Sequence, residues 1–176
     1  MREKSYSAYE EMIHIPLVVS NPRLFPEPRE TQAFYSHLDL LPTLAELAEL
    51  PEPASYGLGR SMVSVLRDPS ASVQDSILFS YDDVFALPAG TAGANLRALR
   101  ERDWTYAVYF GVDGSGIEYE LYDLATDPLQ MKNLLHGSPP GEVRSEWARL
   151  HEALTQKLVE AANLPVSFPW PIAPAN

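Results

Sequence analysis

The sequence contains no cysteine, few basic residues and no long apolar run, and each absence excludes a class of protein or site. Without cysteine, these 176 residues form no disulfide and no thiolate metal site, and they hold no thiol nucleophile or cysteine-derived catalytic residue. Only 13 Lys and Arg stand against 24 Asp and Glu, which gives a net charge of −11. Such a chain lacks the clustered basic residues that nucleic acids and anionic membrane surfaces attract.

The longest apolar runs are a handful of residues, as in Ile15–Val19, so none approaches a membrane span. Arg2 and Lys4 have no apolar segment behind them, so no secretory signal is visible. The content of 45% hydrophobic and 10% aromatic residues is enough for one domain with a sizeable core, or for a core plus a small appendage. Nothing in the composition indicates a cellular compartment.

Residues 1–75 have the pattern of one α/β unit. Ile15–Val19 is apolar on both faces and rich in β-branched residues, which predicts a buried strand. Asn21-Pro22 would end that strand. Asp39 is expected to be the N-cap of a helix over 40–50, whose leucines recur at helical spacing. We therefore expect this part to be the edge of a larger α/β layer.

Residues 76–164 change to an antiparallel β pattern followed by one long helix. The expected elements are strands over 77–81, 96–100, 105–110 and 118–124 and a helix over 142–162. Side chains alternate along the third of these strands, which predicts that one of its faces is buried. Residues 165–176 contain several prolines and are expected to form an extended tail.

Three segments carry motifs, in a fixed order along the chain. They are Lys4 followed by Tyr9-Glu10-Glu11 and Ile15-Pro16-Leu17, then Ser36 to Leu44 with Asp39-Leu40 and Pro42-Thr43-Leu44, and finally Glu118 to Leu124 followed by Asp127-Pro128 and Asn133-Leu134. Together they resemble the C-terminal portion of sulfatases, which belong to the alkaline phosphatase superfamily.

The resemblance implies a fold and an activity. The fold would be the edge of an alkaline-phosphatase-like α/β layer, followed by a small antiparallel sheet of three or four strands packed with a long C-terminal helix. Sulfatases hydrolyse sulfate esters with a formylglycine nucleophile and a divalent cation, usually calcium. Lys4 stands where the family's lysine contacts the sulfate oxygens, and a compact ammonium group suits that oxyanion. Taken alone, Lys4 is equally an ordinary solvated lysine near a chain terminus.

The chain departs from the family's pattern at the reactive groups. The C-x-P-S-R nucleophile motif would lie far upstream of Lys4, and no cysteine is present here. Ser20-Asn21-Pro22-Arg23 lacks the residue between Pro and Arg and follows the wrong strand, so it is rejected as a nucleophile motif. Asp82-Asp83 offers the adjacent carboxylates that calcium can use, but a solvated acidic loop is the favoured interpretation. We therefore expect no metal ligand and no cofactor site within this chain.

The histidines present no clear general acid–base pair. His14 precedes the expected strand and His37 precedes the Asp39 cap, so both are expected to pack or to form hydrogen bonds. His136 and His151, in a loop and on the long helix, have no evident partners.

Aromatic side chains form a second candidate group. Trp104, Tyr106 and Tyr109 either form a platform for a sugar or aryl group or pack in the core, and their alternation along a strand favours the core. Asn133 and Leu134 are expected to provide turn hydrogen bonds and packing, without a catalytic role.

The favoured function is that of the C-terminal portion of a sulfatase-like sulfuric ester hydrolase that is inactive on its own. Two alternatives stay open: a free-standing, non-catalytic binding or assembly module derived from a sulfatase, and part of a phosphate or phosphonate ester hydrolase. Met1 is compatible with an internal methionine, a truncated reading frame or a chosen boundary.

The apolar faces of residues 15–19 and of the helix over 40–50 would have no other part of the protein to cover them, which predicts self-association. The ester substrate is not indicated.

Overall fold

The computed structural model describes residues 7–51, 58–82, 95–165 and 168–171. These residues form two compact units. One holds residues 7–15 together with the described residues from Leu78 onward, and the other is Pro16–Ile77. Each unit has its own set of buried side chains. The expected division at residues 75 and 164 stays a prediction.

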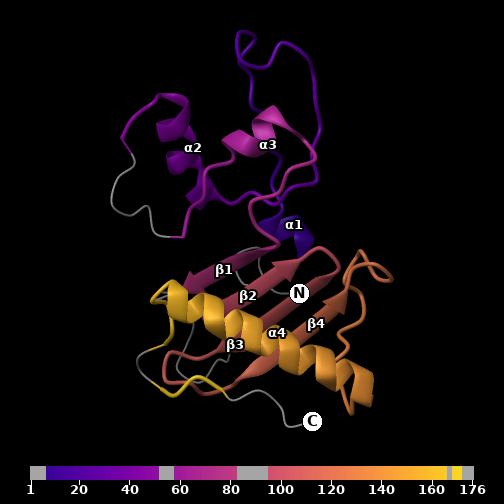
Figure 1. Ribbon diagram of the computed structural model, residues 1–176. Coiled ribbons are helices and arrows are strands. Elements are labelled where there is room, and N and C mark those ends of the chain that lie inside the picture. Colours follow the sequence, from indigo (N-terminus) through magenta and orange to yellow (C-terminus); the bar gives the residue numbers. More distant parts are fainter. Residues whose placement is uncertain (1–6, 52–57, 83–94, 166–167, 172–176) are drawn as a thin grey trace. The chain divides into compact units, whose positions relative to one another are not determined.

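The first unit is built on a four-stranded antiparallel sheet with the strand order β1-β2-β3-β4 (Figure 1). The strands are β1 Ser76–Asp82, β2 Asn95–Glu101, β3 Trp104–Phe110 and β4 Glu118–Asp123. Leu99 of β2 lies opposite Tyr106 of β3, which in turn lies opposite Leu121 of β4. Neighbours in sequence are thus neighbours in space, as short connections favour, and the four strands predicted within residues 76–164 are confirmed.

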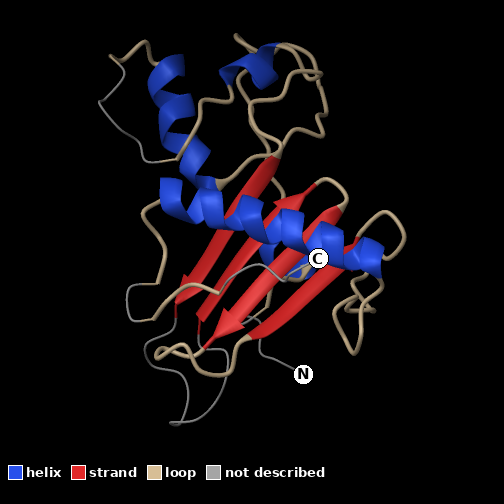
Figure 2. Cartoon of the chain, turned by 60° about the horizontal axis from the view of Figure 1, so that its bottom comes forward, coloured by secondary structure: helices blue, strands red, loops and turns tan. Residues whose placement is uncertain are grey.

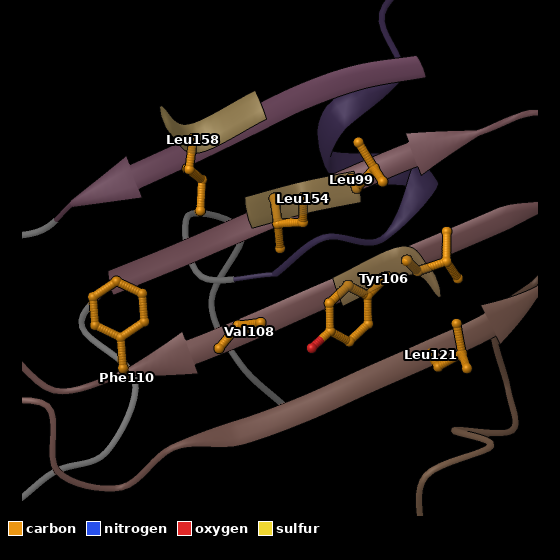
Figure 3. Close-up of a cluster of buried hydrophobic side chains, with 8 residues drawn as sticks. Leu99, Tyr106, Val108, Phe110, Leu121, Leu154 and Leu158 are labelled. Atoms are coloured by element: carbon orange, nitrogen blue, oxygen red, sulfur yellow. The ribbon is translucent and has the colours of Figure 1, made fainter. Parts of the chain in front are cut away.

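Helix α4, Gly141–Glu160, crosses one face of this sheet, as Figures 1 and 2 both show. Its Leu150, Leu154 and Leu158 are fully buried, because residues four apart lie on the same side of a helix. Figure 3 shows the strand side chains that they meet, which are Leu99, Tyr106, Val108, Phe110 and Leu121. Each buried leucine contributes about 1.5–3 kcal/mol, so this cluster is the principal source of the unit's stability.

The opposite face of the sheet is covered as well. Leu96 and Ala98 of β2 and Ala107 and Tyr109 of β3 are buried there together with Ala8, which lies just before the short helix α1, Glu10–Ile13. The prediction that β3 has only one buried face is therefore wrong. A period of two shows which side chains share a face, but it cannot show that a segment about a hundred residues away covers the second one.

The outer edge of β4 is closed by the motif that follows it. The Asn133 side chain accepts hydrogen bonds from the backbone N–H groups of Leu121 and Leu135 through Oδ1 and donates one from Nδ2 to the Tyr119 carbonyl. The Leu134 N–H donates to the Leu121 carbonyl at 2.9 Å. Backbone groups that an edge strand would leave open are thereby satisfied, and the prediction of turn bonding and packing here is confirmed.

The second unit is organised around the buried carboxylate of Asp39, which is 1% exposed. The residues His37–Asp39 form the 3-10 turn η2, Leu40–Leu47 form α2 and Val63–Arg67 form α3. Ser36 is the cap of η2, and the Asp39 carboxylate accepts a hydrogen bond from the Ser36 N–H, which makes a capping box. Asp39 is also the N-cap position of α2, as expected, but its side chain makes no cap bond to that helix and instead completes the capping box of η2.

The helix α2 ends before its predicted boundary at residue 50. Glu49 has φ 53°, and the N–H groups of Glu49 and Leu50 donate to the carbonyls of Glu46 and Ala45. This is a Schellman ending, in which a left-handed residue closes the helix. No glycine marks the position, so the residue types did not indicate this ending.

The segment Ile15–Val19 is not a strand. Residues 14–20 have no regular secondary structure, and Ile15, Leu17, Val18 and Val19 are 45–87% exposed. A strand is stable only when its backbone groups pair with a neighbour, and the sheet of the described residues contains β1 to β4 without this segment. The β-branched composition therefore gave this segment a strand propensity, but no neighbouring strand pairs with it among the described residues.

None of the helices that the structure describes has the length and apolar character that a bilayer span requires.

Candidate functional site

Lys4, the one residue expected to touch a substrate, lies outside the described residues. The structure does describe the residues that follow it, from Ser7 to the end of α1 at Ile13. These residues lie against the face of the sheet opposite α4. Four contacts hold this segment in place.

The first contact is a tyrosine that points from β3 into the covered face. Tyr109 is fully buried, and its hydroxyl accepts a hydrogen bond from the Ala8 N–H at 3.1 Å. The same hydroxyl donates to Glu120 Oε2 at 2.7 Å. A phenol that donates to one group and accepts from another is fully satisfied, so the backbone at Ala8 is fixed four residues after Lys4.

The second contact is an ion pair between Glu10 and Arg100, which are ninety residues apart. The Glu10 carboxylate accepts from Arg100 Nε at 2.5 Å and from a terminal guanidinium nitrogen at 3.2 Å. The two side chains are only 21% and 18% exposed. A guanidinium that meets both carboxylate oxygens fixes orientation as well as distance. Arg100 also donates to the carbonyls of Glu101 and Arg102, so its own position is set by the β2–β3 turn.

The third contact comes from Gln130, which is 3% exposed. Its Oε1 accepts from the Glu10 N–H at 2.7 Å. Its Nε2 has no hydrogen-bond partner among the described residues. The backbone of Gln130 is left-handed, with φ 53°, a conformation that costs a non-glycine residue energy and persists only where surroundings fix it.

The fourth contact joins two tyrosines. The rings of Tyr9 and Tyr122 lie 5.8 Å apart at 46°, and the Tyr122 hydroxyl donates to that of Tyr9 at 3.4 Å. Burial raises the pKa of Tyr122, with smaller contributions from the Tyr9 hydrogen bond and the Glu120 charge. The phenol therefore stays neutral and keeps the proton that it donates.

We call Tyr109, Arg100, Gln130 and Tyr122 the N-terminal clamp. The clamp offers no nucleophile and no acid–base pair. Its chemistry is positional, because it fixes the three consecutive residues 8–10 by backbone, charge and ring contacts. Sequence reasoning found Tyr9-Glu10-Glu11 as a motif but missed Arg100. The available signal was alternation, which puts Arg100 on the same face as the apolar Leu96 and Ala98.

The acidic candidates have structural partners. Asp82 ends β1, and its two oxygens accept hydrogen bonds from the buried guanidinium of Arg97 at 2.7 and 3.1 Å. Asp82 is solvated as expected, with 52% of its side chain exposed, but it ends a strand and does not lie in a loop. Its ion pair with the buried Arg97 was not indicated by alternation. Asp83 lies outside the described residues.

The carboxylate of Asp39 is held in the same way within the second unit. It accepts from the N–H of Ser36 at 2.7 Å, from the N–H of Arg60 at 2.8 Å and from Gln74 Nε2 at 2.7 Å. A buried carboxylate with three donors is a structural centre. It supports the prediction that Asp39 has a capping role and is not a base.

The rejected serine segment is a turn. The Asn21 side chain accepts hydrogen bonds from the backbone N–H groups of Arg23 and Leu24 at 3.1 and 3.2 Å, which is the usual way an asparagine stabilises a turn. Its neighbours are exposed, so the arrangement holds no oriented hydroxyl.

Three histidines are exposed and one is buried. His14, with 75% of its side chain exposed, lies 3.6 Å from the Glu10 carboxylate, and His37 and His136 are exposed as well. Of the two roles expected for His14 and His37, packing is wrong, because both side chains are exposed. His151 is 2% exposed and bonds through both ring nitrogens, a partner set that the sequence did not reveal.

The aromatic residues of β3 belong to the core. Tyr106 and Tyr109 are fully buried, and Trp104 packs against the α4 cluster, so the core interpretation is confirmed over the platform. In the described ranges no group of three or more metal-ligating side chains lies close enough to hold an ion. The described residues therefore do not assemble a calcium site, and no step through calcium is assigned to them.

Comparison with known proteins gives a consistent result. The family pattern described as "N-sulphoglucosamine sulphohydrolase, C-terminal" matches residues 3–161. Arylsulfatase K of Mus musculus is 26% identical over 160 residues, covering 90% of this chain and 27% of that protein. The choline-sulfatase of Rhizobium meliloti (strain 1021) is 32% identical over 137 residues, covering 77% of this chain and 24% of that protein.

Solved structures agree at the level of the fold. A protein determined in complex with its substrate D-glucosamine-2-N,6-O-disulfate matches with a TM-score of 0.59 and 20% identity, covering 72% of this chain and 24% of that one. The chain spans between 24% and 31% of the length of the curated relatives that it matches.

Proposed function

Because this chain belongs to the family of N-sulphoglucosamine sulphohydrolase C-terminal domains, we propose that it is the C-terminal portion of a sulfuric ester hydrolase and is inactive on its own. The whole protein would hydrolyse a sulfate ester with a formylglycine nucleophile and a calcium ion, both supplied by segments not present here. The match over residues 3–161 carries this proposal.

Lys4 is proposed as the only group of this chain that would touch the substrate. Its ammonium group would contact the sulfate oxygens, where negative charge redistributes as the ester bond breaks. The N-terminal clamp supports this role, because a residue that contacts a transition state must be held within a fraction of an ångström. Residues 8–10 are held in that manner by Tyr109, Arg100 and Gln130.

The proposed inactivity of the isolated chain rests on the catalytic groups that it lacks. No cysteine is available for conversion to formylglycine. The two carboxylates considered as a base or a metal ligand, Asp39 and Asp82, accept hydrogen bonds from protein donors. A lysine without a nucleophile contributes binding at most.

The reading frame upstream of Met1 tests the proposal against its alternatives. We expect an in-frame segment that encodes C-x-P-S-R and, before it, an Asp-Asp pair. A promoter and start site directly before Met1 would instead favour a free-standing binding or assembly module. A nucleophile segment other than C-x-P-S-R would favour a phosphate or phosphonate ester hydrolase.

We also propose that the isolated chain associates with itself. Leu40, Leu41 and Leu44 on α2 are 47–58% exposed, although side chains of this kind normally seek cover. The net charge of −11 opposes association at low ionic strength, and salt screens that repulsion. Association that strengthens with added salt is therefore expected.

A further inference from the structure

The residues Phe168–Pro171 at the C-terminal end of the described chain pack onto the core. The rings of Phe168 and Trp170 lie 5.2 and 5.9 Å from the ring of Phe110. Trp170 also stacks on His151, with ring centroids 5.8 Å apart and 19° between the planes. Side chains from the tail thus extend the aromatic part of the α4 cluster. We call residues 168–171 the C-terminal latch.

Polar contacts fasten the latch to α4. The Trp170 Nε1–H donates to Thr155 Oγ1 at 3.0 Å, and the Thr155 hydroxyl donates to the His151 carbonyl at 2.7 Å. On the latch side, the Pro171 carbonyl lies 2.8 Å from His151 Nε2. Each of these bonds leads to His151 or to Thr155 on the same helix, so the polar contacts of the latch centre on His151.

The hydrogen-bond partners of His151 show which of its ring nitrogens carries the hydrogen. A carbonyl only accepts, so Nε2 carries the hydrogen and donates it to Pro171. The Trp147 indole only donates, and it points at the Tyr106 hydroxyl at 3.1 Å. The Tyr106 hydroxyl hydrogen then goes to His151 Nδ1 at 2.7 Å. The chain Trp147, Tyr106, His151, Pro171 is complete only when the imidazole is neutral.

A second proton on the ring breaks this chain. Nδ1 would become a donor and would face an oxygen that already accepts from Trp147, leaving the Tyr106 hydroxyl hydrogen without an acceptor. The positive charge would also sit at a position that is 2% exposed. An uncompensated charge in such a site is strongly disfavoured, and exposure of His151 relieves it.

We propose that His151 is a pH-sensitive switch for the C-terminal latch, in which the neutral ring holds residues 168–171 closed and protonation of the ring releases them. This inference does not depend on the sulfatase assignment. It concerns only the closed and the released state of residues 168–171 and the protonation of the His151 ring, which differs between them.

Among the residues that the structure describes, no charged group around His151 would compensate a second proton. The titratable groups that face it are Tyr106 from β3 and Tyr119 from β4, the latter with its ring 6.5 Å away, and the latch contributes the uncharged Trp170 and Pro171. Burial lowers the pKa of His151, and the hydrogen bond to Pro171 opposes that effect. The direction agrees with the geometry: closure favours the neutral ring.

The sign of the pH dependence follows. With its pKa lowered in the closed state, His151 contributes full stability to the latch above its ordinary pKa of 6.5 and loses it as the pH falls below that value. When the closed state excludes the proton, the ratio of open to closed latch rises by about tenfold between pH 7.5 and 5.5.

Hydrogen exchange of the Trp170 indole N–H measures this ratio directly by NMR, with the resonance assigned through Trp170→Phe. After correction for the intrinsic exchange of free tryptophan, its protection factor should fall about tenfold from pH 7.5 to 5.5. Backbone amides in the β2–β3 pairing should keep the same protection factors at both pH values. A Trp170 protection factor that is constant over this range, or one that falls in step with the sheet amides, would overturn the proposal.

Two variants assign the effect. His151→Gln should remove the pH dependence, whereas His136→Gln, at an exposed histidine, should retain it. Persistence of the dependence in His151→Gln contradicts the proposal. Should that variant fail to fold, the ring ¹⁵N shifts of the unsubstituted chain still decide. At pH 7.5 they should show the neutral form protonated at Nε2, and a charged ring or a proton on Nδ1 contradicts it.

Discussion

Loss of the ion pair between Glu10 and Arg100 should release the segment after Lys4 while leaving the sheet folded. The pair is bidentate, with N–O distances of 2.5 and 3.2 Å, and both side chains are about four-fifths buried. Exposed pairs are worth ~0.2–1 kcal/mol, and breaking a fully buried pair costs ~3–5 kcal/mol. A coupling of about 1–2 kcal/mol lies between these limits.

The assay is native-state hydrogen exchange at the Glu10 amide, which donates to Gln130 in the closed segment. We expect Glu10→Gln and Arg100→Gln each to lower its protection by a factor of about 5 to 30. The double variant should be little worse than either single one, because each already removes the pair. Arg102→Gln, at an exposed arginine two residues along the same turn, is the matched control and should have no effect.

The reasoning fails if the two single effects add within ~0.3–0.5 kcal/mol, which is the behaviour of independent sites. It also fails if the Glu10 amide in the unsubstituted chain exchanges as fast as an unstructured peptide. Midpoints of urea unfolding, followed by circular dichroism, separate local release from general loss of stability, since local release leaves them nearly unchanged.

Four further outcomes follow from the same contacts. Asn133→Ala should lower the free energy of unfolding by about 1–3 kcal/mol, because three backbone groups at the β4 edge lose a partner; an unchanged urea midpoint would contradict this. Asp39→Asn should destabilise the second unit by about 2–4 kcal/mol, seen as faster proteolysis within residues 16–77, whereas equal resistance would argue against a structural carboxylate. Ala162→Gly should stabilise the chain by roughly 1 kcal/mol, because Ala162 ends α4 with φ 49°, and a lower melting temperature would refute that. Leu41→Glu should reduce self-association in light scattering at high salt, and a strictly monomeric unsubstituted chain would remove the proposal.

The strands and α4 could be predicted because their information is local. Alternation fixes which side chains of β3 share a face, and leucines at helical spacing fix the buried stripe of α4. The residues Asn133 and Leu134 were found by motif, and their bonds lie within about a dozen residues of β4. Contacts of this range leave a visible pattern in the sequence.

What the sequence missed depends on distant partners. Glu10 meets Arg100 across ninety residues, and His151 meets Tyr106 across forty-five. No period or motif encodes such a pairing. The error at Ile15–Val19 has the same origin, since strand propensity expresses itself only beside a neighbouring strand.

Hydrolysis of an aryl sulfate by the purified chain, with calcium present, tests the central claim most directly. The account predicts release of aryl alcohol at the rate of buffer alone, because the chain has no cysteine from which a formylglycine could arise. Turnover above buffer that follows the pure protein through successive columns, and that disappears in Lys4→Ala, would show that these 176 residues carry a reactive centre and would contradict it.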